Sequence, residues 1–307
     1  MTSTYLPYPK RNAAGKMNNF SLEDFIGNEN EKTELKRIID FAFLYNPVLR
    51  DNPAAPFPNR IFLYGPPGTG KSYLCRLLID YFFEIASKYN KPAEVICIDS
   101  SFKDKYYGES ERKLREKLSK FNNYDKITLM VIDEIDTLFS SRSFLENQTD
   151  VSLFGELLKN LEGILVENRY NTVLLSTTNS PHKLDAALID RIANKSLFLK
   201  GFVSKEQYQQ LLKKTLEKYA LDCHLLNFSE DDVDYFSEFC YKEQLTPRKA
   251  KKLIDELLFQ IKNKNYHSNL EDYIVKDLRT IRKKLYSNSN LNMRELMSIS
   301  FEYTKDF

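Results

Sequence analysis

Short apolar runs alternate with stretches of helical periodicity over roughly the first two-thirds of the chain. The apolar runs are rich in β-branched residues and predict buried strands at 61–64, 93–99, 127–132, 172–177 and 197–199. Between them, apolar residues recur at helical spacing and predict helices at 28–45, 72–86, 109–121 and 153–165. Strands that alternate with helices indicate an α/β fold, in which helices sandwich a parallel sheet on both faces.

The hydrophobic pattern becomes entirely helical from about Lys205 onward, so we place a domain boundary near Gly201. The amino-terminal residues contain prolines and basic residues without periodicity, which is typical of a flexible arm. We therefore predict four segments: an arm at 1–20, an α/β domain at 21–200, a small all-helical domain at 201–286 and a tail at 287–307.

Composition narrows the class of protein. The 45 basic and 43 acidic residues leave a net charge of +2, which by itself indicates neither a nucleic-acid nor a membrane partner. The chain has no apolar run long enough to span a membrane, no secretion signal at its start and no H-E-x-x-H zinc-protease motif. Four cysteines without C-x-x-C spacing predict buried free thiols: Cys75, Cys97, Cys223 and Cys240. We expect a soluble, cytoplasmic protein.

The strongest chemical motif is Gly65-Pro66-Pro67-Gly68-Thr69-Gly70-Lys71-Ser72, which lies between a predicted strand and a predicted helix. This context distinguishes a phosphate-binding loop from a glycine-rich turn that happens to carry a lysine. Its glycines let the backbone curl around an anion at a helix N-terminus. We expect Pro67, Gly68, Thr69 and Gly70 to surround the phosphates of ATP, Lys71 to contact them, and Ser72 to ligate Mg²⁺.

A second motif, Ile132-Asp133-Glu134-Ile135-Asp136, follows the predicted strand at 127–132. Ligands bind at the carboxyl edge of a parallel sheet, where these carboxylates are expected to lie. Asp133 can hold Mg²⁺ and Glu134 can act as general base toward a water molecule. Acidic residues are common at strand ends, so this motif alone is weak evidence for a nucleotide site. It becomes strong evidence because a phosphate-binding loop occurs earlier in the chain.

These two motifs resemble the Walker A and Walker B motifs of the AAA+ ATPases. The segment from Thr178-Asn179-Ser180-Pro181 to Leu188 is similar to the sensor 1 segment of that family, and the whole resemblance covers about residues 21–260. It implies a P-loop NTPase sheet followed by a helical lid, ATP hydrolysis with Mg²⁺ at subunit interfaces, and a ring, most often a hexamer. It also implies that Asn179 orients the attacking water and that Ile26 and Gly27 contact the nucleotide.

The resemblance extends to the protein-remodelling branch that includes spastin, katanin and the vacuolar-sorting ATPases. Arg191 falls at the last arginine of that branch, which implies an arginine finger reaching into the neighbouring subunit. Ile189 and Asp190 depart from the branch, which has further arginines there. Lys105-Tyr106-Tyr107 before Gly108 resembles the first pore loop and implies a protein substrate gripped in the pore, directly or through an adaptor.

A second departure favours an alternative function. Thr246-Pro247-Arg248 resembles the sensor 2 helix of branch-migration motors, which implies that Arg248 contacts the γ-phosphate. Residues 242–286 contain twice as many basic as acidic residues, so a nucleic-acid motor or loader remains an alternative to protein remodelling. A scaffold that binds ATP without turnover is the third interpretation, and Lys71, Asp133, Glu134 and Asn179 argue against it.

Overall fold

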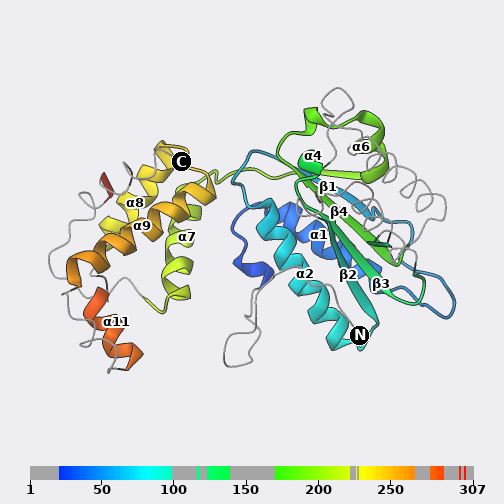
Figure 1. The fold of residues 1–307 in the computed structure, drawn as a ribbon, viewed down its shortest axis with the longest axis horizontal. Helices are drawn as coiled ribbons and strands as arrows, with labels where there is room; N and C mark the ends of the chain where they lie inside the picture. Colours follow the sequence, from blue (N-terminus) through cyan, green and yellow to red (C-terminus); the bar gives the residue numbers. More distant parts are fainter. Residues whose placement is uncertain are drawn as a thin grey trace. The chain divides into compact units, whose positions relative to one another are not determined.

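The computed structural model describes residues 21–98, 116–117, 123–138, 170–221, 226, 228–266, 277–286, 297–298 and 301. The chain divides into two compact units, one comprising residues 1–66 and 71–199 and the other residues 67–70 and 200–307. The first unit holds the sheet and the second is helical (Figure 1).

The first unit contains a five-stranded sheet in the order β2-β3-β4-β1-β5 (Figure 1). Every pair of neighbouring strands is parallel, as the alternating pattern predicts. The described elements are η1 (Leu22–Asp24), α1 (Glu29–Ala42), β1 (Arg60–Tyr64), α2 (Lys71–Lys88), β2 (Ala93–Ile98), β3 (Ile127–Ile132), α4 (Ile135–Leu138), β4 (Thr172–Thr178), η4 (Pro181–Lys183), α6 (Ala186–Ile192) and β5 (Lys195–Phe198).

Both faces of the sheet are covered because alternate residues of each strand point to opposite sides. On one face, Ile61 and Leu63 of β1 pack with α1 and α2 in the larger core. On the other face, Phe62 of β1 packs in a second core with α4 and α6. Figure 1 shows these helix pairs on opposite sides of the sheet. The predicted sandwich of helices around a parallel sheet is therefore confirmed.

The predictions of secondary structure are least accurate where the hydrophobic pattern is short or weak. The last strand was expected at 197–199 but begins at Lys195, because β5 is an edge strand with polar residues at its start. The short helices α4 and α6 were not predicted, since neither is long enough to repeat a helical pattern. Of the predicted helix at 109–121 only residues 116–117 are described, and they are helical; the one at 153–165 lies outside the described residues.

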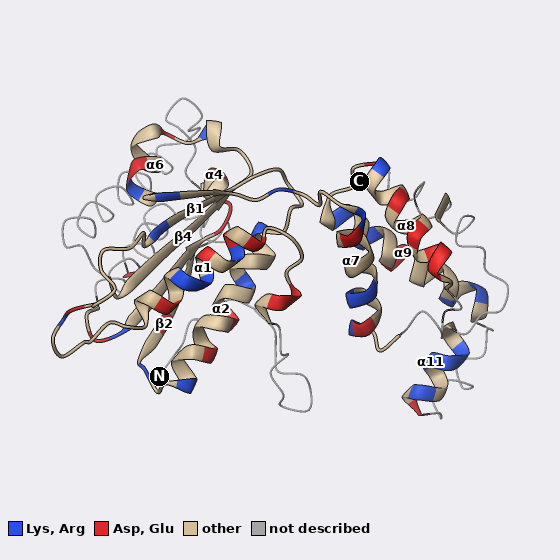
Figure 2. Ribbon diagram, turned by 180° about the vertical axis from the view of Figure 1, so that it is seen from behind, with Lys and Arg blue, Asp and Glu red and all other residues tan. Residues whose placement is uncertain are grey.

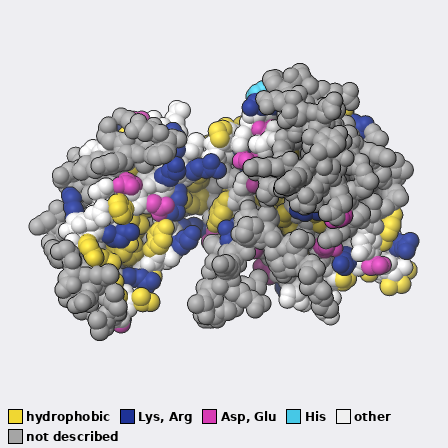
Figure 3. Space-filling view, viewed as in Figure 1, with side chains coloured by type: hydrophobic (Ala, Val, Ile, Leu, Met, Phe, Trp, Pro, Cys, Tyr) yellow, Lys and Arg dark blue, Asp and Glu magenta, His cyan; other side chains and the backbone are white. Residues whose placement is uncertain are grey.

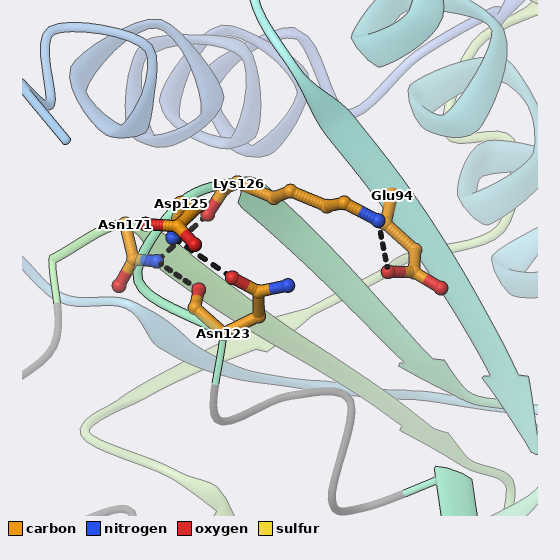
Figure 4. Close-up of polar contacts among 5 residues, drawn as sticks. All are labelled: Glu94, Asn123, Asp125, Lys126 and Asn171. Atoms are coloured by element: carbon orange, nitrogen blue, oxygen red, sulfur yellow. Dashed lines mark hydrogen bonds and ion pairs between the residues drawn. The ribbon is translucent and has the colours of Figure 1, made fainter.

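A polar cluster joins β3 and β4 at the amino-terminal edge of the sheet (Figure 4). The Asn171 side chain is 1% exposed, and its Nδ2 donates to the carbonyl oxygens of Asn123 at 2.9 Å and Lys126 at 2.7 Å. The Lys126 Nζ lies 3.3 Å from Glu94 Oε2 beside it. These bonds fix the turn before β3 against β4 and so set the register that aligns the opposite ends of both strands.

The second unit is helical throughout its described part, as predicted, with α7 (Lys205–Lys218), α8 (Glu230–Lys242), α9 (Pro247–Asn265) and α11 (Leu278–Tyr286). Its core contains the buried side chains of Tyr208, Phe236 and Leu253. The Tyr208 hydroxyl donates to the carbonyl oxygen of Leu245 at 2.6 Å, so this buried ring keeps a polar partner. Thr246 caps α9 and Pro247 occupies the first turn, where its missing N–H costs nothing.

The surface of the helical unit carries charges of both signs (Figure 2). Acidic residues occupy the first turn of α8, whereas Arg279, Arg282, Lys283 and Lys284 lie in α11. Hydrophobic side chains are exposed between Lys and Arg side chains on the face shown in Figure 3. Within the described ranges, no helix combines the length and apolar character needed to cross a membrane. Cys75 and Cys240 are buried thiols outside any disulfide, as predicted; Cys97 is only half-buried and Cys223 lies outside the described residues.

Candidate functional site

Three predicted motifs meet because β1, β4 and β3 are consecutive in the sheet. Tyr64, the last residue of β1, is in register with Thr178 of β4, and Ile132, the last residue of β3, is in register with Ser176. The phosphate-binding loop, Asn179 and the Asp133–Glu134 pair therefore leave the same carboxyl edge of the sheet. This is the edge at which parallel α/β sheets bind their ligands.

The backbone of the phosphate-binding loop has the conformation that its glycines predict. Gly68 and Gly70 have φ values of 80° and 97°, in the left-handed region that glycine tolerates. Gly65 approaches the chain that follows β5 so closely that an added Cβ would lie 2.3 Å from the carbonyl oxygen of Leu199. Any larger residue there would displace backbone, so the loop is shaped as much by packing as by turn geometry.

Lys71 is the first residue of α2, and its side chain folds back over the loop. The residue is 6% exposed, and its Nζ donates to the carbonyl oxygens of Gly65 at 2.7 Å and Pro66 at 2.9 Å. The first turn of α2 contains no acidic residue. The positive end of the helix and the ammonium group together form an anion site with no carboxylate in that turn.

Asp133 is the centre of a compact hydrogen-bond cluster. Its Oδ1 accepts from Ser72 Oγ at 3.1 Å and from Thr177 Oγ1 at 2.6 Å. Glu134 follows with φ of 50°, a strained value for a residue other than glycine. The N–H of Glu134 donates to the same Thr177 hydroxyl at 3.0 Å. The acidic pair is thus held against α2 and β4 at once.

The oxygen atoms in this cluster are suitable ligands for a magnesium ion that is bound together with phosphates. Mg²⁺ prefers oxygen ligands and in phosphate sites takes only one or two from the protein. The Ser72 hydroxyl and the Asp133 carboxylate supply such oxygens side by side. The described residues contain no cluster of three or more His, Cys, Asp and Glu side chains that would hold a metal without phosphates.

The Cys75 thiol lies one helical turn beyond Lys71 and is buried. Burial, and then the negative charge of Asp133, raise the pKa of Cys75 well above its usual value. The thiol is therefore neutral and a poor nucleophile, so we assign it a packing role beneath the site.

Asn179 and the Ile26–Gly27 pair belong to segments next to the elements that carry the phosphate-binding loop. Asn179 directly follows β4, beside the strand ends that carry the loop and the acids. Gly27 is buried with φ of 78° between η1 and α1. The Phe25 ring next to this pair lies 6.3 Å from the Tyr73 ring, so the segment packs near the start of α2. Nucleotide contacts by these residues stay predictions.

Arg191 is not brought to this cluster. Its Nη1 donates to the carbonyl oxygen of Ala187 within α6, and its own carbonyl oxygen accepts from Arg60 Nη1 at 2.8 Å. Arg60 begins β1, whereas the phosphate-binding loop follows the end of that strand. The end of α6 therefore lies at the opposite edge of the sheet, roughly 13 Å away along β1.

The other predicted site residues are not tested by this geometry. Lys105, Tyr106 and Tyr107 lie outside the described residues. Arg248 is exposed as the second residue of α9 in the helical unit, and its contact with a phosphate stays a prediction.

Two residues that shape the site belong to no recognisable sequence motif. Thr177 ends a predicted strand, and Arg60 directly precedes another. A polar residue near the end of an apolar strand indicates that Thr177 could belong to a site. The hydrogen-bond partner of Thr177 cannot be predicted in this way, because it depends on which strand lies beside β4.

Comparison with known proteins assigns the segment that contains these motifs to a family. Residues 61–199 match the model of the ATPase family associated with various cellular activities (AAA). These residues are an AAA ATPase domain. The AAA domain contains the loop, the acidic pair and Asn179, so the resemblance of these motifs to the AAA family is confirmed. The similarity of Thr246-Pro247-Arg248 to sensor 2 lies outside the matched residues and stays a prediction. The structure titled "Crystal structure of FIGL-1 AAA domain in complex with ADP" superposes with a TM-score of 0.65 over 94% of this chain and 86% of that one, at 22% identity, which shows a common fold.

The AAA domain also has relatives by sequence. ATPase family gene 2 protein homolog A of Homo sapiens is 33% identical over 180 residues, which cover 58% of this chain and 19% of the relative. Vacuolar protein sorting-associated protein 4B of Mus musculus is 33% identical over 170 residues, which cover 55% and 36%. The chain thus spans well under half the length of these relatives.

Proposed function

We propose that this chain binds ATP with Mg²⁺ and hydrolyses it to ADP and phosphate. The observation that carries the proposal is the Asp133 carboxylate, which accepts from Ser72 of the phosphate-binding helix and from Thr177 beside Glu134. These two hydrogen bonds join the anion site to the acidic pair. Membership of residues 61–199 in the AAA family supports the same chemistry.

Each residue of the cluster has a distinct role in this proposal. The N–H groups of the loop and the Lys71 ammonium bind the β- and γ-phosphates. Ser72 and Asp133 hold Mg²⁺, whose charge offsets that of the phosphates. Glu134 accepts a proton from the attacking water, and Asn179 donates a hydrogen bond that orients this water. Burial of Lys71 and the neighbouring strand ends strengthens these interactions by limiting access of solvent.

We further propose that the active form is a ring, hexameric as in the AAA+ family, in which Arg191 acts on the neighbouring subunit. Arg191 lies at the edge of the sheet opposite its own phosphate-binding loop, so it does not serve its own site without a large rearrangement. Arg60 holds the end of α6 by donating to the carbonyl oxygens of Asp190 and Arg191. Arg60 thereby fixes the backbone position of Arg191.

Replacing Arg191 by alanine should lower ATP turnover about ten- to hundredfold, because a charged hydrogen bond to the transition state is lost. Mixing Arg191→Ala with Glu134→Gln subunits should restore part of the activity, since some interfaces then pair an intact arginine with an intact glutamate. The matched control is Arg50→Ala, which removes an exposed arginine that stacks on Tyr124. Wild-type turnover in Arg191→Ala, or no gain on mixing, contradicts a role in trans.

As substrate we propose a polypeptide drawn through the centre of the ring. The support is the sequence Lys105-Tyr106-Tyr107 before Gly108, which resembles a pore loop and lies outside the described residues. Adjacent tyrosines offer large contact areas that grip a chain without reading its sequence. The near-neutral net charge of +2 agrees with a protein substrate better than with a polyanion.

We expect Tyr106→Ala to leave basal ATP turnover within about threefold and to abolish its stimulation by an unfolded protein. Stimulation is measured with a permanently unfolded polypeptide and with single-stranded DNA, each at two salt concentrations. Tyr89→Ala serves as a control, because Tyr89 is an exposed tyrosine that directly follows α2. Stimulation by DNA alone that falls with salt and survives Tyr106→Ala would contradict the protein-remodelling function.

That contradictory result would favour the alternative of a nucleic-acid motor. Two observations favour this alternative. The first is that α11 carries four cationic residues and no acid in nine residues. Lysines also lie near exposed rings, with Lys262 Nζ 5.5 Å from the centroid of the Phe259 ring. Cations interleaved with aromatic side chains suit single-stranded nucleic acid.

A further inference from the structure

We propose that Thr177 is a positioning residue that sets the geometry of both acidic residues through a single hydroxyl group. It was not among the residues that the sequence motifs singled out. The inference rests on the roles proposed above for Asp133 and Glu134, and it concerns how this chain holds them in place.

The Thr177 hydroxyl makes two bonds of opposite sense. Its Oγ1 donates to Asp133 Oδ1 at 2.6 Å and accepts from the N–H of Glu134 at 3.0 Å. A hydroxyl has one proton to donate and lone pairs to accept, so both bonds form together. The residue is 1% exposed, and water therefore does not replace either partner when the hydroxyl is removed.

The bond to the Glu134 N–H matters because of the backbone at that residue. Glu134 has φ of 50°, which a residue with a side chain adopts only when its surroundings enforce it. Relaxation of this φ would swing the peptide and turn the Glu134 side chain away from the carboxyl edge of the sheet. We infer that Thr177 stabilises the left-handed turn that aims the general base.

The bond to Asp133 orients the carboxylate proposed to hold the metal. Ser72 Oγ donates to the same Oδ1 from the other side at 3.1 Å. Two hydroxyl groups bonded to one oxygen restrict the rotation of the carboxylate. Without Thr177, the carboxylate is held by Ser72 alone and can rotate.

Strand geometry explains why two successive threonines end β4. Successive side chains of a strand point to opposite faces. Thr177 bonds to Asp133, whereas Thr178 Oγ1 donates to Asp136 Oδ1 at 2.7 Å on the other side of the turn. The end of β4 thus holds both sides of the segment that contains Glu134.

The test compares Thr177→Val, which keeps the β-branched shape, with Thr177→Ser, which keeps the hydroxyl. In the full chain we expect Thr177→Val to lower kcat for MgATP about ten- to hundredfold and to change KM by less than about threefold. Thr177→Ser should recover kcat to within about threefold of wild type. The control is Ser176→Ala, which removes a neighbouring buried hydroxyl that donates to the Ile61 carbonyl oxygen at 3.1 Å, away from the acids. It should keep wild-type kcat.

Hydrogen exchange at the Glu134 amide provides a second readout that requires neither turnover nor a variant. Slow exchange of this amide in the nucleotide-free wild-type protein supports the bond to Thr177, whereas exchange as fast as in an exposed turn overturns it. This measurement decides the matter if Thr177→Val does not fold.

The kinetic outcomes separate the inference from the proposed function. Wild-type kcat in Thr177→Val, or a Thr177→Ser protein as slow as Thr177→Val, overturns the inference while leaving the ATPase intact. Equal losses in Ser176→Ala overturn it too, because they indicate a general effect of removing a buried hydroxyl. If Glu134→Gln hydrolyses ATP at the wild-type rate, the assignment of the general base itself is wrong.

Discussion

Replacing Lys71 by alanine should weaken ATP binding by about two to three orders of magnitude, because several charged hydrogen bonds to phosphate are lost together. The Lys71 Nζ already lies within 2.9 Å of the two carbonyl oxygens that begin the loop. Its ammonium group is therefore poised over the anion site rather than extended into solvent. Titration calorimetry with ATP and Mg²⁺ measures the effect directly.

Lys91 offers a matched control for this change. Its Nζ also donates to two backbone carbonyl oxygens, those of Phe43 at 2.7 Å and Tyr45 at 3.1 Å, but it follows the far end of α2. Lys91→Ala removes the same kind of contact without touching the phosphate-binding loop, so it should bind ATP like the wild type. Equal weakening in both variants, or unchanged binding in Lys71→Ala, would contradict the assignment of the anion site.

Glu134→Gln should keep ATP bound within about threefold of the wild-type affinity and slow turnover about 10²- to 10⁴-fold, since a positioned general base contributes that much. Glutamine preserves the size of the side chain and the backbone N–H that bonds to Thr177. The variant should therefore remain folded with nucleotide in place. Equilibrium binding and single-turnover hydrolysis on the same preparation separate the two effects.

Asp136 provides the control for loss of a negative charge from the same turn. Its carboxylate accepts a hydrogen bond from the Thr178 hydroxyl at 2.7 Å, so we expect Asp136 to stabilise the turn and not to take part in the reaction. Asp136→Asn can still accept that bond and should hydrolyse ATP within about tenfold of wild type. The contradictory outcome is that Asp136→Asn is as slow as Glu134→Gln and that Glu134→Gln also loses nucleotide. In that case the acidic residues stabilise the turn, and Glu134 does not act as general base toward water.

The strands and the phosphate-binding loop were predictable because their signals are local. Buried parallel strands are continuous apolar runs, and β3 was predicted with the bounds that the structure gives it. The loop is recognisable because glycine, lysine and serine are each required at a fixed place between a strand and a helix. Such features depend on neighbours in the sequence and need no knowledge of the fold.

The contacts that assemble the site depend on strand order, which the hydrophobic pattern does not contain. Thr177 reaches Asp133 only because β4 lies beside β3, and Ser72 reaches it from the start of α2. The left-handed backbone at Glu134 is equally hidden, since the residue itself disfavours it. The hydrogen bond from Arg60 to the end of α6 likewise links residues that are 131 positions apart in sequence.

The measurement that tests the central claim most directly is release of phosphate from ATP by the purified chain, with and without Mg²⁺, for the wild type and Glu134→Gln. We predict Mg²⁺-dependent release by the wild type and almost none by Glu134→Gln, although both proteins retain ATP. Equal release by the two proteins, or release by neither under conditions in which both assemble and bind ATP, would contradict hydrolysis at this site.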